Sequence, residues 1–215
     1  MVSDYNKILP FHSSIAPHKD ISHVHLQSIL QEQKKCTKLI SIAKHLCGAG
    51  TDIALKSLSH INTTHEKRFF VFATCCHGLC EWNEYVGRSF LRDLFLKIDD
   101  TFVLDDVYFD AMKRWACCGA TCTTNSSNDL KEEEGKHANN MSNGQDNEKW
   151  NIQQVINQNK LSCTKPGLGR MCQRLIDYGR MEYMKHVLKV KNVNICHYVS
   201  DDITPQNALI LGFVS

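Results

Sequence analysis

The sequence of 215 residues predicts an α/β fold in which helices cover a mainly parallel sheet. Two short apolar segments, 39–43 and 69–73, have the length and composition of buried strands. A segment with helical features follows each of them, and this alternation favours parallel pairing. Two further apolar segments close the chain, and the short connection between them predicts an antiparallel pair.

The other elements follow in order along the chain. Thr51 and Asp52 are typical of a helix start after the first strand. After the second strand, apolar side chains recur on one helical stripe from Trp82 to Lys97. The remaining predicted elements are helices over 105–115 and from after Pro166 to about 188, and strands over 193–199 and 208–213.

Composition divides the chain into two parts. Residues 1–37 form a weakly patterned N-terminal segment, and residues 38–215 carry the predicted domain. Within that domain, residues 123–159 are rich in Asn, Ser, Gln and Glu. Few apolar residues there can offset the entropy of ordering, so we expect a disordered insertion.

The net charge and the cysteine content limit the partners and the compartment to be expected for this protein. The formal net charge of +2 provides no global attraction toward nucleic acid or anionic membrane, so any such binding needs a local cluster. No apolar run follows Met1, and no stretch approaches the length of a membrane span. We therefore expect an intracellular protein of the nucleus or cytoplasm whose 11 cysteines are reduced.

Polar residues follow both predicted inner strands, at the strand ends where α/β sheets bind ligands. They are the segments Lys-His-Leu-Cys-Gly (44–48) and Cys-Cys-His-Gly-Leu-Cys (75–80). If the strands are neighbours, the two segments face each other across one cleft. Lys44 and His45 offer a cation and a base that could activate a hydroxyl group. Alternatively, Lys44 is solvated and His45 is a hydrogen-bonded structural group.

The cysteine spacing supports a second function class. Cys75-Cys76-x-x-x-Cys80 recurs as Cys117-Cys118-x-x-x-Cys122, and four such ligands would hold zinc tetrahedrally. This predicts a non-catalytic, zinc-stabilised RNA-binding or scaffolding module. However, the spacing is not that of common structural zinc sites, and adjacent cysteines rarely bind one ion. We therefore assign no metal ligands and expect these cysteines to pack and shape the cleft.

Two weaker signals complete the pattern. The turn Gly48-x-Gly50 follows a strand, as in nucleotide-binding oxidoreductases, but it lacks the third glycine of that fingerprint. On the helix after Pro166, Arg170 and Arg174 are four residues apart and share a face that could contact phosphates. On spacing alone, a solvated face paired with Glu182 or Asp177 is the better explanation of these arginines.

Three blocks of the sequence resemble a known family. They are Ala-Lys-His-Leu-Cys-Gly-Ala-Gly-Thr-Asp-Ile-Ala-Leu (43–55), Cys-Cys-His-Gly-Leu-Cys-Glu-Trp-Asn-Glu-Tyr-Val-Gly (75–87) and Cys-Gln-Arg-Leu-Ile-Asp-Tyr-Gly-Arg (172–180). The segment 114–119, Arg-Trp-Ala-Cys-Cys-Gly, is also similar to a family motif. The resemblance is to the eukaryotic tRNA 2′-O-methyltransferases that modify the fourth nucleotide of the acceptor stem.

The resemblance implies a Rossmann-like domain that transfers a methyl group from S-adenosylmethionine to a ribose 2′-hydroxyl of tRNA. The implied catalytic residues are Lys44 and His45. The residues then expected to contact the cofactor are Cys47, Gly48, Asp52, Cys75, Cys76 and His77. Those expected to contact RNA are Lys165, Arg170, Arg174 and Arg180.

The sequence also departs from the family pattern. The glycine-rich cofactor loop and the acidic residue after the second sheet strand would precede residue 38, and neither is found in 1–37. The zinc-binding modules that precede the catalytic domain in the family are not found either. We therefore expect the C-terminal part of the domain, truncated at its N-terminus, with an exposed sheet edge. An inactive fragment is an alternative to a working enzyme.

Overall fold

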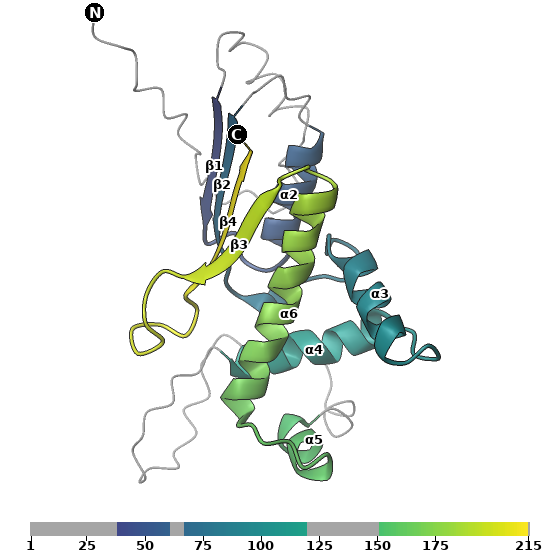
Figure 1. Cartoon of the computed structure of the whole chain (residues 1–215). Helices are drawn as coiled ribbons and strands as arrows, with labels where there is room; N and C mark the ends of the chain where they lie inside the picture. Colours follow the sequence, from purple (N-terminus) through teal and green to yellow (C-terminus); the bar gives the residue numbers. More distant parts are fainter. Residues whose placement is uncertain (1–37, 61–66, 120–150, 215) are drawn as a thin grey trace, which may run out of the picture.

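The computed structural model of the chain describes residues 38–60, 67–119 and 151–214 (Figure 1). Its strands are β1 (Lys38–Lys44), β2 (Lys67–Ala73), β3 (Asn192–His197) and β4 (Ala208–Val214). Its helices are α2 (Ala49–Ser59), the short 3-10 helix η1 (His77–Leu79), α3 (Arg88–Ile98), α4 (Asp106–Cys118), α5 (Ile152–Gln158) and α6 (Lys165–His186). No helix in these ranges has the length and hydropathy needed to cross a membrane.

The four strands form one sheet in the order β1-β2-β4-β3. β1 and β2 are parallel neighbours, with Lys44 opposite Ala73, so the condition for a shared cleft at their ends is met. β4 runs antiparallel to β2 and to β3, which confirms the antiparallel closing pair. The prediction of a mainly parallel sheet is wrong for the described strands, since one of their three pairings is parallel. The short connection between β3 and β4 cannot form a parallel crossover, so β4 turns back and inserts beside β2.

The main core lies between one face of the sheet and helices α2 and α6 (Figure 1). Buried Phe70 and Phe72 of β2 pack there with Leu55 of α2. Alternate residues of a strand point to opposite faces, so Ile40 and Ile42 of β1 face away from these helices. They remain 61% and 70% exposed. Among the described strands, β1 pairs only with β2 and therefore forms one edge of the sheet.

The segment before α3 is a turn and not the first part of a helix. The predicted helix over 82–97 begins only at Arg88. The fully buried Tyr85 explains the difference, because its hydroxyl donates to the carbonyl of Ile176 at 2.9 Å and holds the turn against α6. An added Cβ at Gly179 would lie 1.9 Å from that hydroxyl oxygen, so the close approach requires glycine there.

Part of the predicted disordered insertion is ordered. Residues 120–150 lie outside the described part of the chain, but α5 falls within the predicted range of 123–159. The side chain of Asn151 caps α5 by accepting from the amides of Gln153 and Gln154. Ile152 and Ile156, four residues apart, are both buried. Two apolar residues on one helix face are enough to order this short helix, although the segment 123–159 as a whole is polar.

Candidate functional site

A pocket of about 440 Å³ lies at the end of β1 and β2. Lys44 and His45 line it from the end of β1, and Cys75 and Cys76 line it from the end of β2. The two segments thus share one cleft, as expected for neighbouring parallel strands. His45 and Cys76 adopt left-handed backbone conformations, with φ of 63° and 50°, which are uncommon for residues other than glycine. Such conformations concentrate at functional sites.

The connection between β3 and β4 forms a further wall of this pocket, which the sequence analysis missed. Tyr198 and Gln206 line the pocket from this connection. The side-chain oxygen of Gln206 accepts from the amide of Cys76 at 3.3 Å, and the Tyr198 hydroxyl donates to the Gln206 carbonyl at 3.1 Å. No local pattern identifies these residues, because they reach the pocket only through the insertion of β4 beside β2.

Three cysteine sulfurs gather at the same strand ends. The sulfurs of Cys47, Cys75 and Cys76 all lie within 4.8 Å of one another, and those of Cys47 and Cys75 are 3.6 Å apart. Burial is the main reason that the pKa of Cys75 and of Cys76 is raised, and the neighbouring Cys47 thiol raises both further. Without a bound cation, both side chains are therefore neutral thiols near neutral pH.

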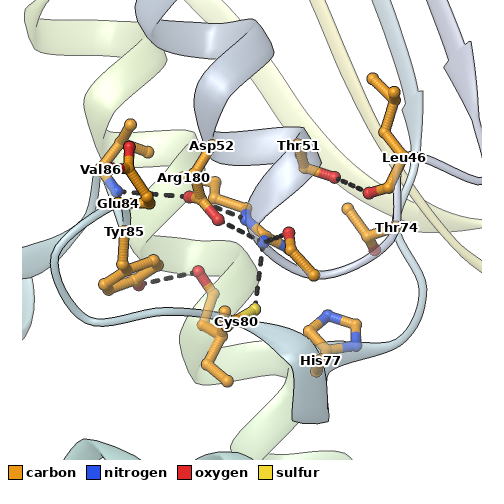
Figure 2. Close-up of polar contacts among 12 residues, drawn as sticks. Leu46, Thr51, Asp52, Thr74, His77, Cys80, Glu84, Tyr85, Val86 and Arg180 are labelled. Atoms are coloured by element: carbon orange, nitrogen blue, oxygen red, sulfur yellow. Dashed lines mark hydrogen bonds and ion pairs between the residues drawn. The ribbon is translucent and has the colours of Figure 1, made fainter. Parts of the chain in front are cut away.

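Beneath this surface, Arg180 forms a fully buried ion pair (Figure 2). Its Nη2 lies 2.6 Å from Asp52 Oδ2, and its Nε donates to Asp52 Oδ1 at 3.2 Å. The Nη2 also donates to the Gly48 carbonyl and to the Cys80 sulfur, at 3.0 and 3.3 Å. Burial disfavours the charge, but Asp52, Cys80 and Asp177 together outweigh it, so the pKa of Arg180 lies well above its usual range. The guanidinium thus joins α6, α2 and the segment after β2.

The Asp177 carboxylate links this ion pair to the end of β2. It accepts from Arg180 Nη1 at 3.1 Å and from the Thr74 hydroxyl at 2.8 Å. The Nε2 of His77 lies 2.9 Å from the same carboxylate, and the buried Nδ1 of His77 has no hydrogen-bond partner among the described residues. Burial would raise the pKa of Asp177, but His77, Arg180 and Thr74 together hold it below its usual value.

Several residues predicted to touch ligands belong to this buried network. Arg180 and Asp52 are fully buried and His77 is 4% exposed, so Arg180 is not on the predicted RNA surface and the other two do not line the pocket. Gly48 is buried too, and an added Cβ would lie 2.3 Å from the Leu79 carbonyl oxygen. In this structure their polar groups are engaged within the network and hold the strand ends in place. Arg180 can be buried because Asp52 on α2 and Asp177 on α6 neutralise its charge.

The Thr74 hydroxyl provides a test of the network. We expect Thr74→Val to lower the free energy of unfolding at neutral pH by about 1.5–3 kcal/mol, because it removes a buried hydrogen bond to a charged group. Folding lowers the pKa of Asp177, so the ionised Asp177 carboxylate stabilises the folded protein. This stabilisation is complete above the usual aspartate pKa, and it is lost as the pH falls through the pKa of Asp177 in the folded protein. The difference between the two proteins should therefore shrink in acid, as urea titrations over pH would measure.

Thr101→Val is the matched control for this test. Its hydroxyl donates to the exposed Asp99 at 2.6 Å, so the same chemical change occurs in water. We expect a smaller effect from this variant, because water can replace an exposed hydrogen bond. A Thr74→Val effect that equals the control, or that stays constant into acid, would contradict the proposed coupling to Asp177.

Unlike Arg180, the predicted RNA-binding residues in the N-terminal half of α6 are accessible. Lys165 is exposed, and Arg170 and Arg174 are half-buried. Arg174 contacts His197 at the end of β3, directly before Tyr198 of the pocket wall. The basic residues of α6 therefore continue toward the pocket.

The lining of the pocket bears on whether S-adenosylmethionine fits the described residues. Cys75 and Cys76 line the pocket, and the Cys47 sulfur lies beside them. A nucleoside is commonly held by a carboxylate on its ribose hydroxyls. None of the described residues that line this pocket is acidic, and the Asp52 carboxylate is occupied by Arg180. The described residues of this pocket therefore do not fit the nucleoside end of the donor.

A pocket with titratable groups at the strand ends of an α/β sheet defines a candidate ligand-binding or catalytic domain. Comparison with known proteins identifies its family. The family model described as Methyltransferase TRM13 matches residues 16–213. This match covers most of the chain, which therefore belongs to the TRM13 methyltransferase family. No solved structure gives a significant match.

Curated relatives agree with this assignment. A human protein named tRNA:m(4)X modification enzyme TRM13 homolog is 25% identical over 239 residues, which cover 89% of this chain and 47% of that protein. The Saccharomyces cerevisiae tRNA:m(4)X modification enzyme TRM13 is 25% identical over 191 residues, covering 81% and 36%. A Dictyostelium discoideum homologue is 38% identical over 82 residues, covering 34% and 15%. The chain spans half or less of the length of these relatives.

Proposed function

We propose that this chain forms the acceptor side of an S-adenosylmethionine-dependent tRNA 2′-O-ribose methyltransferase that acts on the acceptor stem, in the nucleus or cytoplasm. The observation that carries the proposal is the position of Lys44 and His45, which line a pocket at the strand ends of a TRM13-family chain. The names of the curated relatives support tRNA as the substrate. The α/β sheet, with its parallel β1–β2 pair, supports a Rossmann-like domain.

In this proposal, Lys44 and His45 act on the ribose hydroxyl. A bound donor would supply an electrophilic methyl group on sulfonium. A hydroxyl is a weak nucleophile unless a base removes its proton or a cation stabilises the alkoxide, and histidine and lysine provide these two functions. Both side chains are exposed at the pocket, where a ribose could reach them. His45 would take the proton of the ribose hydroxyl, and Lys44 would stabilise the charge that develops on its oxygen.

The proposed reaction can be tested with tRNA that lacks one hydroxyl group. The chain, alone and together with the N-terminal region of the yeast relative, is supplied with methyl-labelled S-adenosylmethionine and a tRNA transcript. We expect label on the fourth acceptor-stem nucleotide, and no label when that nucleotide carries a 2′-deoxyribose. Label that survives the deoxy substitution would contradict 2′-O transfer. No transfer with either form of the protein would contradict the proposed function.

We also propose that the accessible basic residues of α6 contact tRNA phosphates. Arg170 and Arg174 follow Lys165 at intervals that place the two arginines on one face, and the exposed Tyr178 lies four residues further. Because Arg174 contacts His197 next to the pocket wall, RNA bound along this face would lead toward Lys44. An aromatic side chain beside basic residues can also stack on an unpaired base.

The double variant Arg170→Gln, Arg174→Gln is expected to lower the affinity for tRNA and to make that affinity less dependent on salt. Each lost phosphate contact should reduce the slope of log affinity against log salt by about 1. Fluorescence anisotropy with labelled tRNA over a range of salt concentrations measures both quantities. Lys185→Gln is the control, because Lys185 lies near the other end of α6 and pairs with Glu182. An unchanged slope in the double variant, or an equal change in the control, would contradict the proposed surface.

A further inference from the structure

The three clustered thiols have the spacing of a metal site. In tetrahedral zinc–thiolate sites the Zn–S distance is about 2.3 Å, which separates the sulfurs by about 3.8 Å. The sulfurs of Cys47 and Cys75 are 3.6 Å apart, and all three separations in the cluster are at most 4.8 Å. Side-chain rotations that close the wider separations by about 1 Å or less would therefore complete three corners of a tetrahedron.

The backbone of Cys76 explains how two adjacent cysteines can serve one ion. In a regular strand, successive side chains point to opposite faces, so neighbouring cysteines are poorly placed to bind together. β2 ends at Ala73, and Cys76 adopts the left-handed conformation with φ of 50°. The change of direction brings both sulfurs to the same place, beside the Cys47 sulfur from the segment after β1.

The repeated sequence pattern indicated a different set of cysteines. Cys80, the third member of the first pattern, is fully buried and its sulfur contacts Arg180 at 3.3 Å. It is not part of the sulfur cluster, and Cys122 lies outside the described residues. The described structure instead adds Cys47, which comes from another strand end. The pairing of β1 with β2, and not the repeated Cys-Cys-x-x-x-Cys pattern, therefore determines which cysteines cluster.

We propose that Cys47, Cys75 and Cys76 bind one zinc ion through their sulfurs, with a water molecule from the pocket as the fourth ligand. Cys75 and Cys76 line the pocket, so solvent can reach this position. Each thiol loses its proton to solvent on binding, and three Zn–S bonds form per ion. The ion would tie the end of β1 to the end of β2 and fix the backbone that carries Lys44 and His45. This inference does not depend on the proposed methyl transfer.

Metal content of the purified chain tests the proposal. We expect one zinc per chain by elemental analysis, and a clear loss in Cys47→Ser, Cys75→Ser and Cys76→Ser. Loss of an outer-shell partner already costs about 10–100-fold in metal affinity, so loss of a direct ligand should cost at least as much. Cys163→Ser is the matched control, since Cys163 is half-buried and lies outside the cluster. No zinc in the chain, or equal loss in the control, would overturn the proposal.

A second measurement needs no variant and so does not depend on how the serine variants fold. The unmodified chain is treated with iodoacetamide, with zinc or after a chelator, and the alkylated cysteines are mapped by mass spectrometry. Zinc should protect Cys47, Cys75 and Cys76 selectively and leave Cys163 unchanged. Cobalt should give a sulfur-to-metal charge-transfer absorption at the same site. Equal alkylation of the three cysteines with and without zinc would contradict the site, even if methyl transfer is observed.

Discussion

Arg180→Met is expected to lower the free energy of unfolding by about 3–5 kcal/mol, because it leaves buried carboxylates without their cation. The guanidinium pairs with Asp52 at 2.6 Å and with Asp177 at 3.1 Å, and all three side chains are fully buried. Methionine retains much of the volume but none of the five donor groups. Urea unfolding followed by circular dichroism measures the loss.

Two further variants separate the buried charge from other effects of this substitution. Lys185→Met breaks an ion pair with Glu182 on the same helix, but both side chains are partly exposed, and such pairs contribute about 0–1 kcal/mol. Adding Asp52→Leu to Arg180→Met should restore part of the stability, because it removes the carboxylate that has lost its partner. A loss from Arg180→Met as small as that of the control would show that the network is not a major source of stability.

Lys44→Met and His45→Asn are each expected to lower the rate of methyl transfer by about 100-fold or more, with little change in melting temperature. The size of the effect follows from the loss of a general base or of a cation that stabilises the alkoxide. Both residues are exposed, so neither substitution removes core packing. Asparagine is chosen at position 45 because it tolerates the left-handed conformation that His45 adopts, with φ of 63°.

Lys38→Met provides the control for the two site variants. Lys38 begins β1 and is exposed like Lys44, but it lies at the opposite end of the strand and does not line the pocket. Its substitution should leave transfer unchanged. Single-turnover assays with tRNA, together with melting curves, separate chemistry from folding. Equal losses of activity and melting temperature in the site variants would instead support the alternative in which Lys44 is solvated and His45 is structural.

Local patterns in the sequence predicted the strands well but could not assign every side chain to a surface. The arginines of α6 show the reason. Arg170, Arg174 and Arg180 belong to one helix, and spacing alone distinguishes them weakly. Arg180 is buried because Asp52 of α2 and the Cys80 segment after β2 pack against its side of the helix. Such partners lie about 100 residues or more away in the sequence, where helical periodicity carries no information.

The sequence by itself determined the two parallel strands and the place where they end. Short apolar runs specify strands, although β1 has no buried residue. Neighbouring parallel strands end at the same edge of a sheet, so once β1 pairs with β2, Lys44 and His45 lie close to Cys75 and Cys76. Only the tertiary structure decided what surrounds them. The insertion of β4 beside β2 brings Tyr198 and Gln206 to the pocket, while the turn at Cys76 gathers three sulfurs. These arrangements depend on pairings between distant segments and on one left-handed residue, which local composition does not encode.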